Sequence, residues 1–108
     1  MPESFERGAL TEAVFYILLC LHEPMHGYAI MQNVEKLTEG RVMLGPGTLY
    51  GAINALVERG WITSSSERDS RKKKYIITAA GRKVFDGEID RLKELLHNSE
   101  SIRGGERP

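Results

Sequence analysis

The sequence has only one cysteine among 108 residues, so it cannot form a disulfide framework. Cys20 lies inside an apolar run, where a free cysteine behaves as a small core residue. A chain without disulfides is typical of a reducing compartment, and we predict a cytoplasmic location. The strongest apolar run, AVFYILLCL at 13–21, is too short for a bilayer, which takes about 20 residues. It also begins too far into the chain for a secretion signal, so we expect no membrane association.

The sequence also lacks an excess of charge of either sign, because 15 Lys and Arg balance 15 Asp and Glu. This balance argues against a uniformly basic coat but leaves room for local basic patches. His22, His26 and His97 do not share a spacing that suits a metal ion. No glycine-rich phosphate loop follows a strand, and no nucleophile, base and orienting acid can be recognised together. We expect no enzyme activity, no metal and no cofactor.

Short periodic segments make up most of the chain. Apolar residues at helical spacing predict a helix from Leu10, capped by Thr11 or a neighbour, and a second helix over 28–37. A third helix is predicted within 45–60, where Gly60 ends it. The first helix is apolar nearly all round and must be covered on more than one side, either by this chain or by a second copy.

The segments between and after these helices predict strands and a long final helix. RVML at 41–44 is compatible with a short strand, and WITSSS with KKYIIT reads as a hairpin around a polar loop. A long amphipathic pattern then runs from about Ala80 to Ser99. In it, Glu88 and Arg91 form an i,i+3 pair of the kind that supports an exposed helical surface.

This order of elements is typical of a winged helix-turn-helix, a mainly α (α+β) fold in which the third helix enters a DNA groove. We assign 1–79 to the DNA-binding domain and 80–108 to a C-terminal dimerisation helix with a frayed tail. A small α+β domain without a particular function has the same order, so the order alone leaves both interpretations open.

The predicted third helix has an unusual outer face. Leu49, Ile53, Leu56 and Val57 are predicted to fall on one side. The opposite side is small and polar, with Gly47, Thr48, Gly51, Asn54 and Ala55. A glycine inside a helix costs roughly 1 kcal/mol relative to alanine. Small residues would let the backbone approach DNA, and hydroxyl and amide groups bond phosphates or base edges. The alternative is that these residues fit between neighbouring helices.

A cluster of basic residues marks the predicted hairpin loop. Its members are Arg68, Arg71, Lys72, Lys73 and Lys74. Each cation that neutralises a phosphate releases counterions, so a few of them give a salt-dependent affinity for DNA. A solvated loop has the same composition. The position of the cluster, where a wing would lie beside a recognition helix, favours DNA.

The last helix carries an apolar stripe with roughly coiled-coil spacing, formed by Phe85, Ile89, Leu92 and Leu96. The stripe predicts a homodimer, with packing on its own domain as the alternative. A dimer would also cover the surplus apolar surface of the first helix, and two-fold proteins read two half-sites of DNA.

Four motifs together resemble the PadR family of bacterial transcriptional regulators, and in particular its short members with a single C-terminal helix. They are HGYAI (26–30), GPGTLYGAINALVERGWI (45–62), RKKKYIIT (71–78) and EIDRLKELL (88–96). The resemblance implies a dimeric repressor that binds inverted repeats near promoters. By position it implies DNA contacts at Tyr28, Thr48, Tyr50, Asn54, Ser70, Arg71, Lys72 and Lys73. It places the dimer contacts on the first and last helices, where we select Ile89, Leu92 and Leu96.

The resemblance also implies, for some members, release from DNA by flat aromatic or lipophilic compounds. Short members that bind drugs use a tryptophan on the last helix, whereas the one tryptophan here, Trp61, follows the third helix and is interpreted as core. If an effector pocket exists, we expect Phe15, Phe85, Ile89 and Leu92 to line it. The alternative function is a protein–protein interaction module without direct DNA binding, whose basic residues would not align on one face.

Overall fold

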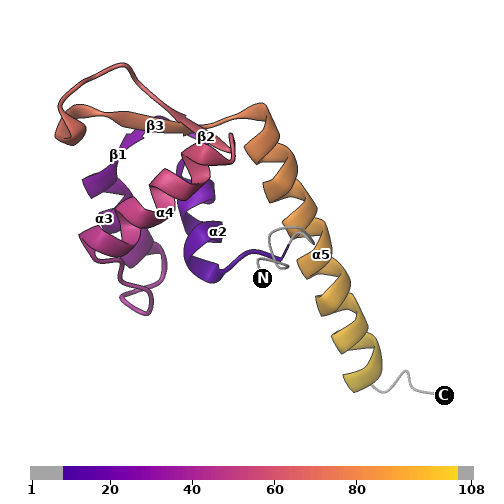
Figure 1. The fold of residues 1–108 in the computed structure, drawn as a ribbon. Helices are drawn as coiled ribbons and strands as arrows, with labels where there is room; N and C mark the ends of the chain where they lie inside the picture. Colours follow the sequence, from indigo (N-terminus) through magenta and orange to yellow (C-terminus); the bar gives the residue numbers. More distant parts are fainter. Residues whose placement is uncertain (1–8, 105–108) are drawn as a thin grey trace.

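The computed structural model describes residues 9–104 (Figure 1). Its elements follow the predicted order, except that one strand is added and the strand expected at 41–44 does not form. The helices are α2 (Glu12–Cys20), α3 (Gly27–Leu37), α4 (Pro46–Glu58) and α5 (Ala79–Arg103), and the strands are β1 (Met25–His26), β2 (Ile62–Ser64) and β3 (Lys74–Ile77). A 3-10 turn, η1 (Ser70–Lys72), lies between β2 and β3. The addition is β1, which completes an antiparallel sheet of order β1-β3-β2. The fold is a winged helix, as predicted.

The prediction of a strand at 41–44 is wrong, because Arg41 and Val42 form a bend and residues 43–44 are irregular in the connection from α3 to α4. Glu39 and Gly40 have positive φ angles of 51° and 82°, which turn the chain sharply after α3. The backbone N–H of Val42 then donates to Oγ1 of Thr38 at 3.0 Å. This N–H is therefore occupied by the turn and does not join a sheet.

Helix α2 lies between α3 and α5 and packs against both. This position confirms that a helix apolar on several faces is covered on more than one side. The buried core around it consists of Val14, Ile17, Leu18, Cys20, Leu21, Ile30, Val34, Leu49, Ile53, Leu56, Ile62, Tyr75, Ile77 and Phe85. Trp61 is half-buried against this core, which agrees with its interpretation as a packing residue, and the Arg59 guanidinium lies 5.5 Å from its ring centre.

Helix α5 is longer than predicted, with 25 residues, or about 37 Å at 1.5 Å per residue. Its first half packs along α2 and its second half projects away from the body (Figure 1). The molecule is therefore elongated, with extents of 60 × 28 × 26 Å.

The expectation that Glu88 belongs to an exposed helical surface is wrong. The Glu88 side chain is only 2% exposed, although it pairs with Arg91 as the spacing suggests. Its carboxylate is buried because it accepts a backbone N–H from Leu10, which brings the segment ahead of α2 across this face of α5.

Candidate DNA-binding surface

The outer face of α4 is open. Thr48 and Asn54 are exposed, and among the described residues nothing lies within 4 Å of a Cβ built on Gly47 or Gly51. The opposite face packs into the core through Leu49, Ile53 and Leu56. The small residues at the start of α4 therefore do not fit against neighbouring helices, and the alternative explanation for them does not hold.

Tyr50 joins α4 to the start of α3. A Cβ built on Gly27 would lie 2.3 Å from the Tyr50 hydroxyl oxygen, so only glycine allows this tyrosine its present position. The Tyr50 ring is half-buried and packs against the core, whereas Tyr28, next to Gly27, is 66% exposed. Of the two predicted contact tyrosines, Tyr28 is free to reach a ligand and Tyr50 also anchors the helix.

His26 links the start of α3 to the wing, by which we mean β2, β3 and residues 65–73 between them. Its Nδ1 donates to the backbone carbonyl of Lys73 at 3.2 Å, and His26 pairs with Lys74 in the sheet. His26 is the first residue of the HGYAI motif, but the sequence does not predict this contact with the wing. This contact joins the start of α3 to the wing, and α3, the start of α4 and the loop of the wing lie on the side of the molecule away from α5 (Figure 1).

The tip of the wing is shaped by η1. The Arg71 backbone N–H donates to Oδ1 of Asp69 at 3.0 Å, and the Lys72 N–H donates to the Asp69 carbonyl oxygen at 2.8 Å. Ser70 contributes its backbone to this turn. Arg71 and Lys72 are exposed, and Lys73 is half-buried. Two of the three predicted wing cations are therefore exposed.

The N-termini of α3 and α4 also differ from those of the other helices. Thr11 Oγ1 accepts from Val14 N at the start of α2, and Thr78 Oγ1 accepts from Gly81 N at the start of α5. No side-chain cap hydrogen bond is found at the start of α3 or α4 within residues 9–104. Unsatisfied N–H groups and the positive end of the helix dipole favour an anion such as phosphate.

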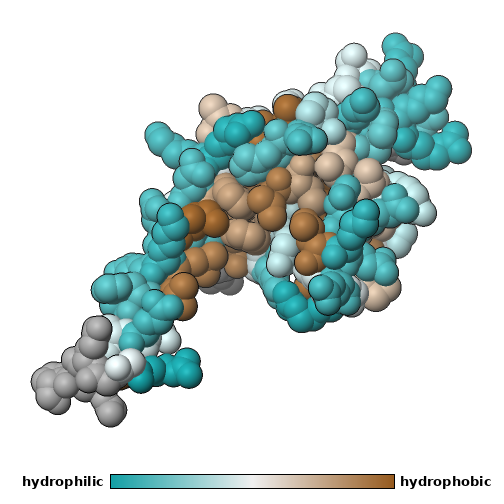
Figure 2. Space-filling model, turned by 180° about the vertical axis from the view of Figure 1, so that it is seen from behind, coloured by the Kyte–Doolittle hydropathy of each residue, from teal (hydrophilic) through white to brown (hydrophobic). Residues whose placement is uncertain are grey.

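The second half of α5 carries an exposed apolar stripe. Leu92, Leu95, Leu96 and Ile102 are 39%, 51%, 58% and 53% exposed. Figure 2 shows hydrophobic side chains that extend from this helix onto the body of the molecule. The opposite end of the molecule, at the upper right of that view, is hydrophilic. Of the predicted dimer residues, Leu92 and Leu96 are exposed and Ile89 is half-buried against the core.

A hollow of about 300 Å³ lies between α2 and α5. It is lined by Leu10, Glu12, Phe15, Tyr16, Glu88, Arg91 and Leu92. Two of the four residues predicted for an effector pocket, Phe15 and Leu92, are among them. Phe85 instead lies in the core, with its ring centre 4.8 Å from that of Phe15, and Ile89 packs beside it.

Charged groups line one side of this hollow. The Arg91 guanidinium donates to both Glu88 carboxylate oxygens, at 2.8 and 2.6 Å, and this pairing holds the pKa of Glu88 below its ordinary value. Glu12 pairs with Arg41, which belongs to the connection between α3 and α4. The hollow therefore combines aromatic walls with ion pairs whose charges are already balanced.

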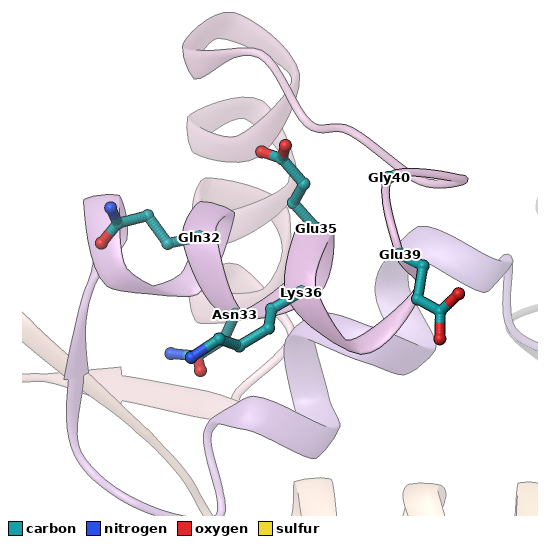
Figure 3. A pocket seen from close by; sticks show the side chains of 6 residues that line it. All are labelled: Gln32, Asn33, Glu35, Lys36, Glu39 and Gly40. Atoms are coloured by element: carbon teal, nitrogen blue, oxygen red, sulfur yellow. The ribbon is translucent and has the colours of Figure 1, made fainter.

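A second hollow, of about 600 Å³, lies on the outer side of α3 and the turn after it (Figure 3). Its lining is polar throughout: Gln32, Asn33, Glu35, Lys36, Glu39 and Gly40. Small-molecule sites are lined mainly by apolar and aromatic side chains, so this surface does not resemble one.

Metal sites and membrane spans are both missing from the described part of the chain. Residues 9–104 hold no group of three or more His, Cys, Asp or Glu side chains placed to bind a metal ion. Over the same range, no helix combines the length and apolar character needed to cross a membrane.

Comparison with known proteins agrees with this geometry. The chain is 27% identical over 89 residues to the transcriptional regulator YqjI of Escherichia coli, which covers 82% of this chain and 42% of that protein. Among solved structures, a PadR-like transcription factor from Bacteroides fragilis is 27% identical with a TM-score of 0.70, covering 94% of this chain and 97% of the other. RosR of H. salinarum is 31% identical with a TM-score of 0.63, covering 82% and 76%.

The chain spans less than half the length of the curated relatives it matches. The family model described as the transcriptional regulator PadR-like family matches residues 17–87, which include α3, α4 and the wing. This match covers more than half of the chain. The chain belongs to the PadR-like family of transcriptional regulators.

Proposed function

We propose that this protein is a transcriptional repressor that binds an inverted-repeat operator in double-stranded DNA as a homodimer. The observation that carries the proposal is the open face of α4, where Gly47 and Gly51 have free space around them beside an exposed basic wing. A recognition helix must bring its first turns close to base edges, and large side chains would hold it away. As a regulator of transcription, the protein would act in the cytoplasm.

The contacts follow from the chemistry of each element. Thr48 and Asn54 offer hydroxyl and amide groups to base edges, with Tyr50 behind them and Tyr28 beside them on α3. In the wing, we assign the phosphate contacts to Ser70, Arg71, Lys72 and Lys73. Phosphate contacts fix the register of the helix and base contacts select the sequence, so the two elements serve one binding event.

Binding to DNA is tested by fluorescence anisotropy with the duplex upstream of the protein's own gene and a scrambled duplex, at several salt concentrations. We expect the upstream duplex to bind at least about 10³-fold more tightly, as is typical of specific regulators. Equal, salt-sensitive binding to both duplexes would leave a DNA-binding protein whose operator lies elsewhere. Absence of binding at low salt would contradict the proposal and favour a protein–protein interaction module.

The role of the wing is tested with a pair of matched double variants. Arg71→Ala with Lys72→Ala removes two exposed cations from the wing, and Arg82→Ala with Lys83→Ala removes two exposed cations from the start of α5. We expect only the wing pair to flatten the plot of log K against log salt, by about 0.9 for each phosphate that the wing no longer neutralises. If both pairs flatten the plot equally, the salt dependence comes from the total charge of the protein and not from the wing.

The dimer is inferred from the exposed stripe on α5, which contains Leu92 and Leu96. A second copy that packs its α5 against this stripe, with Ile89 at the inner edge, would remove the apolar surface from water. Sedimentation analysis should give a dimer for the wild type and a monomer for Leu96→Glu. Asn98→Glu, on the same exposed part of the helix, is the control that should remain dimeric.

A small lipophilic or aromatic effector is the last part of the proposal, and the hollow between α2 and α5 supports it. Its volume of about 300 Å³ is at the lower end for ligand sites, and Phe15, Tyr16 and Leu92 give it apolar walls. We expect the fluorescent probe anilinonaphthalene sulfonate to bind the wild type and to lower its affinity for DNA. If the probe binds Leu92→Glu as well as it binds the wild type, the effector site is not in this hollow.

A further inference from the structure

Asp69 is an acidic residue at the tip of a wing that is otherwise strongly basic. Its Oδ1 accepts from the Arg71 backbone N–H at 3.0 Å and from Arg71 Nε at 3.3 Å, and its Oδ2 accepts from Arg71 Nη2 at 3.3 Å. The Asp69 carbonyl oxygen also accepts from the Lys72 N–H. A single residue therefore both starts η1 and holds the Arg71 guanidinium at two points.

This ion pair contributes little to the stability of the fold. The Arg71 side chain is 88% exposed and the Asp69 side chain is 35% exposed. Solvent screens pairs of this kind, so their net contribution to the free energy of unfolding is small. The pairing instead changes what the wing offers to a polyanion, because a phosphate that approaches Arg71 meets the Asp69 carboxylate and has to displace it.

The number of free cations sets the sequence-independent part of DNA affinity. Each phosphate that a protein neutralises releases counterions, and this term supplies essentially all non-specific binding. A genome offers a very large number of non-specific sites that compete with the operator. A wing with all five of its basic residues unpaired would bind arbitrary DNA more tightly and reduce the advantage of the correct sequence.

We propose that Asp69 determines the selectivity of the wing by holding Arg71 in an internal ion pair and so limiting its attraction to arbitrary DNA. The inference rests on the proposed DNA binding. The backbone contacts of Asp69 keep η1 folded, and its side chain withholds one cation from non-specific phosphate contacts. Asp69 is thus a positioning residue that acts through Arg71 and not a DNA contact.

Three substitutions separate the charge of Asp69 from its role in the turn. Asp69→Asn keeps a side-chain oxygen for the Arg71 N–H and removes the negative charge. Asp69→Glu keeps the charge on a longer side chain that fits the turn less well. Glu67→Gln removes one negative charge from the same loop, two residues away, and is the matched control.

The experiment measures anisotropy of the full chain with a scrambled duplex over a salt series. We expect Asp69→Asn to bind more tightly at low salt and to steepen the salt slope by about 0.9, the value for one additional phosphate contact. Glu67→Gln and Asp69→Glu should steepen it less. In the Arg71→Ala background, Asp69→Asn should leave the slope unchanged, and the melting temperature of Asp69→Asn alone should match that of the wild type.

Two results would overturn the inference. One is a salt slope for Asp69→Asn equal to that of the wild type, which would mean that the Asp69 charge does not affect DNA binding, or equal to that of Glu67→Gln, which would mean that any negative charge in the loop has the same effect. The other is steepening by Asp69→Asn that persists without Arg71. Failure of the wild type to bind any duplex contradicts the proposed function itself. If the wild type binds DNA but Asp69→Asn does not change the salt slope, only the proposal that Asp69 holds Arg71 back is contradicted.

Discussion

Two helices of this protein have glycines in their first two turns for opposite reasons. At the start of α5, a Cβ built on Gly81 would lie 2.1 Å from the Trp61 carbonyl oxygen and 2.7 Å from Cγ1 of Ile77. At the start of α4, a Cβ on Gly47 or Gly51 meets nothing within 4 Å among the described residues. The first glycine allows the chain to pack against itself, and the other two keep a surface clear.

The hydrogen bonds at the two helix starts follow the same division. Thr78 Oγ1 accepts from Gly81 N at 3.0 Å and donates to the Gly60 carbonyl oxygen at 2.6 Å, and Thr78 N donates to the Trp61 carbonyl oxygen. Gly45, the N-cap residue of α4, has no side chain and therefore makes no such cap. The hydrogen bonds of Thr78 therefore join the start of α5 to the residues that follow α4. The start of α4 has no side-chain cap and remains available to a partner.

The largest effect is expected from Gly81→Ala. The new methyl group meets a backbone carbonyl that cannot move without shifting β2, so we expect a loss of about 3 kcal/mol in unfolding free energy, the upper end for overpacking. Gly87→Ala on the same helix has nothing within 4 Å in the described structure and should gain about 0.5–1 kcal/mol. Thermal and urea unfolding measure both. Equal stability of the two variants would show that the start of α5 is not tightly packed.

Much of this architecture was predictable, because the longer elements repeat their apolar residues at a clear period. The helices and the hairpin follow from that period, and Gly60, with φ 78°, ends α4 as expected. Strand β1 was not predictable, since two residues cannot show an alternation. The segment 41–44 looked like a strand by composition, but the turn at Thr38 to Gly40 determines its backbone.

A smaller effect is expected from Thr78→Ala. This substitution removes the cap of α5 and the hydrogen bond to the Gly60 carbonyl, so the expected loss is about 2 kcal/mol. Thr11→Ala removes only the cap of α2 and should cost about 1 kcal/mol. Chemical unfolding of both variants measures the difference. A larger loss for Thr11→Ala would contradict the view that Thr78 joins two elements.

The candidate site was predictable in its charges and its small residues but not in its contacts. The basic loop and the glycines of α4 are visible in the sequence, and the structure leaves Thr48, Asn54, Arg71 and Lys72 exposed. The roles of His26, Gly27 and Asp69 depend on atoms brought together by the fold. Glu88 shows the same limit: its spacing to Arg91 predicted the pair, but only the position of Leu10 explains its burial.

The smallest effect on stability is expected from Gly51→Ala, which is also the sharpest test of the open face. Because the position is helical, exposed and unobstructed, alanine should raise the unfolding free energy by about 0.5–1 kcal/mol, as Gly87→Ala does on α5. The two variants should differ in DNA binding, since the methyl group at position 51 lies where a groove would approach and that at position 87 does not. Anisotropy should therefore give weaker binding for Gly51→Ala only. Wild-type affinity in a stabilised Gly51→Ala would mean that DNA does not approach this turn of α4, and that the glycine serves neither packing nor recognition.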